Sequence, residues 1–316
     1  MKIFWKIPTQ FEYKNVGLTI GVFDGVHLGH QKIITGLIES CRKNGMTSLI
    51  ITFEIHPKKI LSSTTPGSLT TINQRMDIIS NMGMKAFIVT DFEQEIMSFE
   101  ATEFVEKVLI DKLRMKELWI GTNFLFGKER KGDVQLLREL SARKGFNLQV
   151  VEPVKFENEV ISSTRIREYL RQGDVEKASL LLSRPYSVVA EVIHGVKRGR
   201  IMGYPTANLL WEKEILLPKE GVYAIKVKID DKEYAGITNL GYRPTFGEEK
   251  ELYFEVHILD FKKEIYSKEL NVSFIKRIRE EMLFKDKYSL IRQLKEDENR
   301  TREIFRNANC GLRIAN

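Results

Sequence analysis

The sequence predicts two domains of different class: a doubly wound α/β domain with a parallel sheet, then an antiparallel β-barrel with a terminal helix. In the first 183 residues, apolar strand-like runs alternate with helical patterns, which favours a parallel sheet with helices on both faces. From residue 186 on, short strand-like runs are separated only by turn signals, which favours a barrel or sandwich. The pattern changes near Ser183-Arg184-Pro185, so we expect domains at 1–183 and 184–316.

The elements of the first domain are predicted in order from their periodicity. Strands are expected at 18–23, 47–53, 86–91, 117–121 and 147–154, with helices at 33–41, 72–83, 98–113, 133–145, 162–173 and 174–183. Sheets of this class bind ligands beyond the carboxyl ends of their strands. The polar residues that follow these strand ends are Asp24, His27, His30, His56 and Asn123. We expect them to converge on one crevice.

The second domain is predicted as five strands and one helix. The strand-like runs cover 186–193, 221–229, 232–241, 252–261 and 268–278, and helical spacing returns at 288–305. No internal repeat and no low-complexity tract is present in the sequence.

Composition excludes several classes of protein. The net charge of +7 comes from scattered Lys and Arg, without a basic block or an interleaved aromatic ladder, so we expect polyanionic small substrates and no nucleic-acid partner. No apolar run approaches the roughly 20 residues of a membrane span, and the N-terminus lacks the apolar core of a signal peptide. The cysteines, Cys41 and Cys310, cannot form a disulfide framework. We expect a cytoplasmic protein without a membrane partner.

The first chemical motif is LTIGVFDGVHLGHQ, residues 18–31. His27 and His30 stand between an apolar strand-like run and a helical pattern, where free N–H groups and the helix dipole favour an anion. Gly29 between them lets a nucleotide approach the backbone. Two imidazole donors here suit a polyphosphate whose charge grows during reaction. Taken alone, the histidines could also be a metal pair or exposed polar residues.

A second anion motif is ISSTRIR, residues 161–167. Its three hydroxyls and its arginine at a helix start offer donors to a phosphate. Alone, such a run is more often a plain helix cap. The hydroxyl residues are Ser162, Ser163 and Thr164, and the last arginine is Arg167.

Together, the two motifs resemble the HxGH and ISSTxxR signatures of the nucleotidyltransferase superfamily, and the flanks of the first look most like bacterial bifunctional riboflavin kinase/FAD synthetases. The resemblance implies that the first motif holds the α-phosphate of ATP and the second the departing pyrophosphate. It implies catalytic roles for His27, His30 and Arg167. The positions that it implies for nucleotide binding are Gly21, Phe23, Asp24, Gly29, Asn123, Ser162, Ser163 and Thr164.

The second domain carries HGVKRGR, residues 194–200, leading to GYPTAN, residues 203–208. Glycines between basic residues let backbone N–H groups wrap phosphates, although the G-K-[ST] ending of a Walker A loop is missing. Thr206 and Asn208 would share one side of an extended backbone, where their neutral oxygens could hold Mg²⁺. A Gly-Pro turn explains Gly203 and Pro205 but not the accompanying Thr and Asn. The run resembles the PTAN motif of riboflavin kinases.

The resemblance covers nearly the whole chain, with GVYA at 221–224 and NLGYRPTF at 239–246 as further matches. It implies that Glu255 is the general base for the ribityl hydroxyl; a rim glutamate in solvent is the alternative. Alternation places Glu255 and His257 on one strand face, and a glutamate in a barrel mouth is costly unless it is used. The implied nucleotide- and flavin-binding residues are Gly195, Gly199, Arg200, Gly203, Pro205, Thr206, Asn208 and Arg279, with Arg277 as the alternative to Arg279.

The resemblance therefore implies two reactions on one chain: phosphorylation of riboflavin to FMN, then adenylylation of FMN to FAD, with ATP and Mg²⁺. The family usually has proline where Ile55 stands and glycine where Ser267 stands, which leaves open that only one module is active. His56 could be structural. An RNA-handling protein is a rival because class I aminoacyl-tRNA synthetases share the H-x-G-H turn, but their KMSKS loop is absent. A flavin-binding regulator without catalysis is a further alternative. It would need no pyrophosphate site, so the presence of both N-terminal motifs argues against it.

Overall fold

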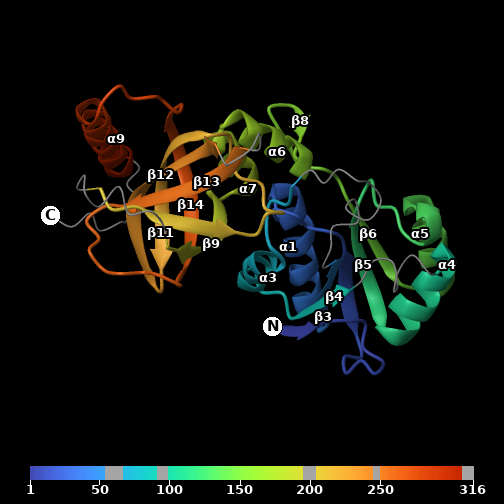
Figure 1. The fold of residues 1–316 in the computed structure, drawn as a ribbon. Coiled ribbons are helices and arrows are strands. Elements are labelled where there is room, and N and C mark those ends of the chain that lie inside the picture. Colours follow the sequence, from blue (N-terminus) through green and yellow to red (C-terminus); the bar gives the residue numbers. More distant parts are fainter. Residues whose placement is uncertain (54–66, 91–98, 195–203, 245–249, 308–316) are drawn as a thin grey trace. The chain divides into compact units, whose positions relative to one another are not determined.

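The computed structural model describes residues 1–53, 67–90, 99–194, 204–244 and 250–307 (Figure 1). It forms two compact units, Met1–Ser163 and Thr164–Asn316. The sequence-predicted positions that lie outside the described residues are Ile55, His56, Gly195, Gly199, Arg200 and Gly203.

The first unit is built on a six-stranded sheet with the order β1-β4-β3-β2-β5-β6. Every neighbouring pair in it is parallel. The strands are β1 (Lys2–Phe4), β2 (Val16–Ile20), β3 (Thr47–Phe53), β4 (Ala86–Thr90), β5 (Met115–Gly121) and β6 (Asn147–Val151). The predicted doubly wound parallel sheet is confirmed, with β1 as an edge strand that the sequence did not reveal.

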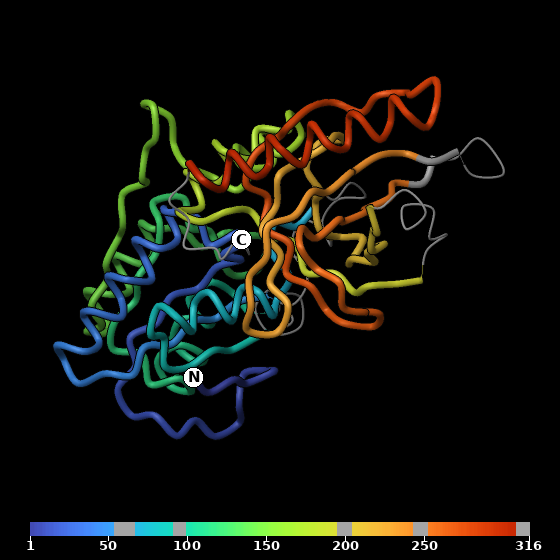
Figure 2. The backbone as a smooth tube through the Cα atoms, turned by 90° about the vertical axis from the view of Figure 1, so that its left-hand side faces the viewer, coloured from blue at the N-terminus to red at the C-terminus, as the bar shows by residue number. Residues whose placement is uncertain are grey.

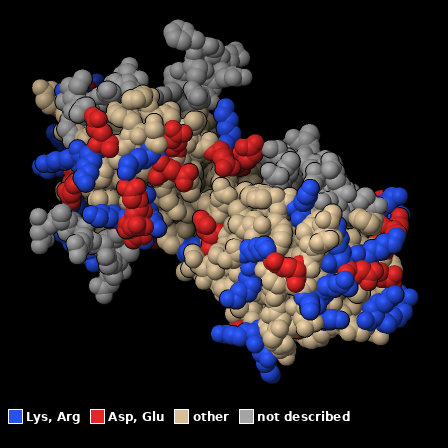
Figure 3. All heavy atoms as spheres, turned by 90° about the horizontal axis from the view of Figure 1, so that it is seen from below, with Lys and Arg blue, Asp and Glu red and all other residues tan. Residues whose placement is uncertain are grey.

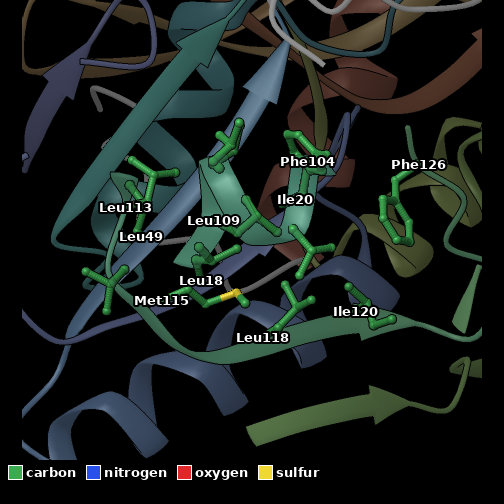
Figure 4. Packing of buried hydrophobic residues seen from close by; sticks show 14 of the residues in the cluster. Leu18, Ile20, Leu49, Phe104, Leu109, Leu113, Met115, Leu118, Ile120 and Phe126 are labelled. Carbon is green, nitrogen blue, oxygen red and sulfur yellow. The ribbon is translucent and has the colours of Figure 1, made fainter. Parts of the chain in front are cut away.

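Helices cover both faces of this sheet. On one face, α1 (Leu28–Lys43) and α3 (Ile72–Asn81) bury Leu37 and Ile79 against strand residues such as Ile50. On the other face lie α4 (Ala101–Glu103), which continues as the π-helix η2 (Phe104–Lys112), and α5 (Val134–Lys144). Figure 4 shows Phe104 and Leu109 packed over the sheet. The apolar clusters on the two faces hold the strands in place, so the first residues of each loop that follows a strand are fixed.

Helix starts follow ordinary capping chemistry. Thr71 caps α3 in a capping box, in which its hydroxyl accepts from the Gln74 N–H and the Gln74 side chain accepts from the Thr71 N–H. Asp133 accepts from the Leu136 N–H at the start of α5, and Gly145 ends that helix in the left-handed conformation.

The predicted strand at 18–23 is wrong at its end, because β2 stops at Ile20. Phe23 and Val26 have φ of +51° and +42°, so the chain turns through left-handed conformations that side chains rarely adopt. The Phe23 ring is buried in the core under α1 and α3. Burial of this ring offsets the backbone strain and fixes the path of the loop into α1.

The second unit is a closed antiparallel barrel with the strand order β10-β13-β12-β11-β14-β9. The strands are β9 (Tyr186–Ile193), β10 (Ala207–Trp211), β11 (Gly221–Ile229), β12 (Lys232–Pro244), β13 (Lys250–Ile258) and β14 (Glu269–Arg279). The terminal helix α9 (Lys287–Asn307) packs on β12 and β14 (Figure 2). The predicted barrel and helix are confirmed, and β10, which follows the PTAN run, was missed as a strand.

Aromatic rings fill the barrel. Phe274 stacks with Tyr186 and Phe254 at centroid distances of 6.2 and 6.1 Å and meets Tyr223 edge-on at 5.4 Å. Since side chains alternate along a strand, the neighbours of these residues point outward. An outer apolar cluster that includes Val222, Ile237, Ile278 and Phe305 seats α9.

Two helices precede the barrel, α6 (Ser163–Gln172) and α7 (Val175–Leu182). Glu176 of α7 pairs with Lys276 of β14 at 3.0 Å, and the turn at Gly173 lies against Arg277, where a β-carbon would come within 2.9 Å of the Arg277 side chain. The compact units divide after Ser163, the first residue of α6, whereas the sequence-predicted boundary follows residue 183; that boundary stays a prediction.

The minor elements are the hairpin of β7 (Lys155–Phe156) and β8 (Glu159–Val160) and the short 3₁₀ helix η3 (Lys128–Arg130). Of the helices in the described ranges, none is long and apolar enough to cross a membrane.

Candidate functional site

The two imidazoles of the first motif lie at the N-terminus of α1. His27 is the cap residue, and its Nδ1 accepts from the His30 N–H at 3.4 Å. The two rings stack at a centroid distance of 3.6 Å and an interplanar angle of 19°. Because Nδ1 of His27 accepts, the proton of its neutral ring is on Nε2, which leaves Nε2 as a donor. The geometry therefore places two imidazoles together at the positive end of a helix.

Burial lowers the pKa of His30 well below 6.5, and the nearby His27 and Arg75 lower it further. The ring is therefore neutral at physiological pH. Its Nδ1 is buried and has no hydrogen-bond partner among the described residues. A neutral imidazole offers one N–H donor without bringing a full charge into the site.

Asp24 anchors the loop that carries the histidines. Its buried carboxylate accepts from the N–H of Leu69 at 2.9 and 3.1 Å and from the N–H of Thr70 at 3.1 Å. The Ser163 hydroxyl donates to the Asp24 carbonyl at 2.9 Å, which brings a residue of the second motif to the first. The carboxylate thus holds the backbone before α3, and its direct contact with a nucleotide stays a prediction.

Arg75 is a residue of this region that the sequence analysis missed. It is buried on α3, and its Nη1 donates to the Thr52 hydroxyl at 3.3 Å and to the Phe53 carbonyl at 3.4 Å. Thr52 in turn donates to the Val22 carbonyl at 3.1 Å. Arg75 therefore ties the end of β3 to the loop after β2. Its signal in the sequence is a charge within the apolar stripe of Ile72, Met76 and Ile79.

The glycines of the first motif make room for rings. A β-carbon at Gly29 would lie 3.1 Å from the His27 ring, and one at Gly21 would lie 3.0 Å from the Phe23 ring. Phe23 itself meets His30 edge-on at 5.2 Å. Gly29 thus serves the packing of the first imidazole, and its predicted approach to a nucleotide is not tested.

The remaining predicted positions of the adenylyltransferase motifs have different surroundings. Asn123 is exposed after β5, the strand next to β2 in the sheet, and Ser162 is half-buried. Thr164 and Arg167 belong to the second compact unit, where Thr164 is exposed and Arg167 is buried in α6. The nucleotide-binding roles of these residues stay predictions.

In the barrel, Glu255 lies between two asparagines of neighbouring strands. It is directly opposite Asn208 of β10 on one side and Asn239 of β12 on the other. Directly opposed residues on antiparallel strands point to the same face, and the inward neighbour Phe254 assigns this row to the outer face. The predicted proximity of Glu255 and Asn208 is present, but on the outside of the barrel rather than in its mouth. Sequence reasoning had not singled out Asn239.

The strand entry at Pro205 is held by two side chains. The His257 ring nitrogen Nδ1 lies 2.8 Å from the Pro205 carbonyl oxygen. The Tyr204 hydroxyl donates to Glu298 of α9 at 3.4 Å, and Glu298 accepts from Arg302 at 2.8 Å. These contacts fix the backbone from which Thr206 and Asn208 project.

Thr206 also lines a cavity of about 300 Å³. Its walls are mainly apolar, and its charged lining residues are two lysines and Glu264. The lining residues include Val192, Val256, Phe261, Lys262, Lys263 and Tyr266.

Arg279 forms an ion pair with the terminal helix, and Ser267 has a left-handed backbone conformation. The Arg279 guanidinium is paired with buried Asp297 of α9, with Nε–Oδ1 at 3.0 Å and Nη2–Oδ2 at 2.8 Å. Its role as a flavin ligand stays a prediction. Ser267 has φ of +58°, which explains why glycine suits this position.

Comparison with known proteins matches two family models to separate parts of the chain. The model of the FAD synthetase family matches residues 10–165, and that of the riboflavin kinase family matches residues 182–305. A bifunctional riboflavin kinase/FMN adenylyltransferase of Buchnera aphidicola is 37% identical over 90% of this chain and 91% of its own length. The chain belongs to the bifunctional riboflavin kinase/FMN adenylyltransferases. The resemblance inferred from the motifs is confirmed.

Other relatives support the same assignment. The bifunctional enzymes of Bacillus subtilis and Escherichia coli strain K12 are 34% and 32% identical, over 92% and 91% of this chain and 92% of their own lengths in both cases. A crystal structure described as a macrolide-efflux protein from Streptococcus pneumoniae matches with a TM-score of 0.85 and 32% identity, covering 93% of this chain and 95% of that one. The efflux role in that description belongs to that protein alone.

The chain is therefore an enzyme with two activities. Its C-terminal module phosphorylates riboflavin to FMN with ATP, and its N-terminal module transfers the adenylyl group of ATP to FMN, giving FAD and pyrophosphate. Both family models match, which favours two working modules over the alternative of a single one.

Proposed function

We propose that adenylyl transfer takes place at the N-terminus of α1 and riboflavin phosphorylation at the outer-face row of Asn208 and Glu255. The observation that supports the first assignment is the stacked imidazole pair at a helix N-terminus. The observation that supports the second is the carboxylate directly opposite the asparagine of the PTAN run.

For adenylyl transfer, the FMN phosphate attacks the α-phosphorus of ATP, and pyrophosphate leaves. A phosphate is ionised at neutral pH, so the reaction requires stabilisation of charge rather than a strong base. His27 and His30 supply ring N–H donors, and the free N–H groups of α1 add the helix dipole. Arg167 and the hydroxyls of Ser163 and Thr164 are proposed to bind the pyrophosphate. Gly21, Phe23, Asp24, Gly29, Asn123 and Ser162 form the remaining nucleotide contacts in this proposal.

For phosphorylation, Glu255 takes the proton of the ribityl hydroxyl, whose oxygen attacks the γ-phosphorus of ATP. Positioning and charge neutralisation carry most of the catalysis in phosphoryl transfer. We assign the cavity beside Thr206 to the nucleoside part of ATP, because its mainly apolar walls suit a base. Pro205 and Arg279 are proposed to contact nucleotide or flavin.

Magnesium is part of the proposal for the kinase site. Among the described residues, no group of three His, Cys, Asp or Glu could hold a metal by itself. Magnesium usually takes few protein ligands and completes its shell with waters and phosphates. The neutral oxygens of Thr206 and Asn208 beside Glu255 fit that preference, and the ion would neutralise phosphate charge there.

The two-site assignment is tested with flavins supplied separately. Wild-type protein with riboflavin, ATP and Mg²⁺ should give FMN and FAD on chromatography. His30→Ala should accumulate FMN, and Glu255→Gln should still convert supplied FMN to FAD. Loss of both reactions from either single change in a folded protein would refute separate sites.

We propose a cytoplasmic location, where ATP is available, and small molecules as the partners. On the face shown in Figure 3, Lys and Arg side chains are interspersed with Asp and Glu. A nucleic-acid site calls for basic side chains gathered on one face, and the mixed charge of this face supports small-molecule substrates instead.

A further inference from the structure

Asn239 of β12 carries a polar atom to which the two reactions give no role. Its Oδ1 is buried and has no hydrogen-bond partner among the described residues. Buried polar atoms in proteins are nearly always paired, and an unpaired one calls for an explanation. A ligand that donates a hydrogen bond would supply one.

The orientation of this amide is fixed by Tyr253. Asn239 Nδ2 donates to the Tyr253 hydroxyl oxygen at 2.8 Å, and the same hydroxyl donates to Glu281 Oε1 at 2.6 Å. A phenol has one proton, and the carboxylate takes it, so the oxygen of Tyr253 must accept from Asn239. Reversing the amide would set two acceptors against each other. The unpaired atom is therefore the oxygen, an acceptor held in place.

Glycine at position 241 gives Glu281 its place in this chain of contacts. Gly241 is directly opposite Tyr253 on the paired strands. A side-chain carbon at 241 would overlap the Glu281 carboxylate. The absent side chain lets Glu281 cross β12 and reach the Tyr253 hydroxyl. Glu281, Tyr253 and Asn239 thus form one line of hydrogen bonds.

This line ends beside the proposed catalytic base. Asn239 and Glu255 are directly opposed on β12 and β13, and side chains so placed have β-carbons about 4.5–5.5 Å apart. A molecule whose hydroxyl reaches Glu255 therefore lies within reach of Asn239.

The chemistry of the oxygen selects one ligand. An amide oxygen accepts hydrogen bonds, whereas phosphate oxygens also accept, so the phosphates of ATP are not complementary to it. Magnesium is less suited, because Asn239 and Asn208 flank Glu255 from strands on opposite sides, about 9.5 Å apart at two strand spacings. The ribityl chain of riboflavin, in contrast, carries several hydroxyl donors.

We propose that Asn239 Oδ1 accepts a hydrogen bond from a second ribityl hydroxyl, a neighbour of the one that Glu255 deprotonates, and so orients the nucleophile. The inference rests on the proposed role of Glu255. It makes Asn239 a substrate-orienting residue, and Tyr253 and Glu281 positioning residues that act through it.

The test is Asn239→Ala in the full chain. Loss of one hydrogen bond to substrate should lower kcat/KM for riboflavin about tenfold, with the KM for ATP, the Mg²⁺ dependence and the conversion of supplied FMN to FAD unchanged. Riboflavin analogues that each lack one ribityl hydroxyl provide a second test. With the wild type, the analogue that lacks the hydroxyl bound by Asn239 should have a lower kcat/KM than riboflavin. With Asn239→Ala, this analogue and riboflavin should have the same kcat/KM.

Asn271→Ala is the matched control. Asn271 also has a buried Oδ1 without a partner among the described residues, but it is opposite Lys228 on β11, away from Glu255. Its replacement should leave kcat/KM for riboflavin unchanged. Should Asn239→Ala fail to fold, Tyr253→Phe keeps the Asn239 amide and removes only the hydroxyl that orients it. A smaller loss of kcat/KM, confined to riboflavin, supports the inference.

Contrary results are distinct. An unchanged kcat/KM for riboflavin in Asn239→Ala, or additive losses with every deoxy analogue, overturns the inference. A raised Mg²⁺ requirement overturns it in favour of a metal ligand. An active Glu255→Gln kinase refutes the proposed site itself, whatever Asn239 does.

Discussion

The two proposed phosphate-transfer sites of this enzyme are assembled in different ways. In the first unit, Asp24 and His27 lie on the loop after β2, and His30 and Ser163 lie in the first turns of α1 and α6. Each is fixed by hydrogen bonds or ring contacts. In the barrel, Asn208, Glu255 and Asn239 lie within strands, and strand register alone brings them together. The first arrangement depends on turns, caps and individual side-chain contacts, whereas the second depends on the register of paired strands.

The difference predicts how far the structural effect of a substitution extends in each region. A change at one of these residues of the first unit should alter the contacts of that residue and leave the register of the sheet intact. A change in register in the barrel would displace all three side chains of the row at once. Five predictions, ordered by expected effect, test this comparison.

Glu255→Gln should reduce riboflavin phosphorylation by about 1,000-fold, within the range for loss of a general base. The amide keeps the shape but cannot take the proton. Initial rates of FMN formation measure the loss, and Glu269→Gln at an exposed position of β14 is the control. A variant with near-normal FMN formation would exclude Glu255 as the base.

His30→Ala should reduce FAD formation from supplied FMN by about 100-fold, as for loss of one donor to developing charge. The His27 donor and the helix N-terminus remain, so the loss is incomplete. FMN formation in the same sample is the internal control. Equal losses in both reactions would point to misfolding instead.

Arg75→Gln should raise the pKa of His30, because a nearby positive charge that lowers it is removed. The neutral His30 of the folded state contributes stability that is present above the unfolded value of 6.5 and is lost as the pH falls below it. Urea unfolding as a function of pH, together with the NMR titration of the His30 ring, should show a smaller loss on acidification in the variant. Arg42→Gln, at an exposed position of α1, should behave as wild type.

Asp24→Asn should destabilise the first unit by about 2 kcal/mol, since a buried carboxylate that accepts from two backbone N–H groups is replaced by a neutral amide, which accepts weaker hydrogen bonds. Urea unfolding measures the change, with exposed Asp77→Asn as the control. An equal effect of the two changes would mean that the anchor contributes little.

Ser267→Gly should stabilise the barrel slightly, by about 0.5 kcal/mol, because glycine adopts the φ of +58° without strain but loses more backbone entropy on folding. The thermal unfolding midpoint measures this, and both activities should persist. A clear loss of stability would show that the serine side chain makes a compensating contact.

The same contrast explains what the sequence could predict. The doubly wound sheet and the barrel follow from hydrophobic periodicity, and the motif of His27 and His30 is contiguous, so both were predictable. The row beside Glu255 depends on strand register, even between the consecutive strands β12 and β13, and side-chain periodicity does not report register; Asn239 was missed for that reason. Arg75 was missed because its partners are backbone and hydroxyl groups of β3. The left-handed turn at Phe23 depends on tertiary burial of its ring, which strand propensity cannot report.

The closure of the barrel has a consequence for biosynthesis. The first strand of the barrel, β9, is paired on one side with the last, β14. A ribosome must therefore release the chain through Arg279 before the ring of hydrogen bonds can form, while the parallel sheet can assemble from residues made much earlier. The FMN-making module thus matures after the parallel sheet of the FAD-making module, and a message truncated before β14 yields no closed barrel.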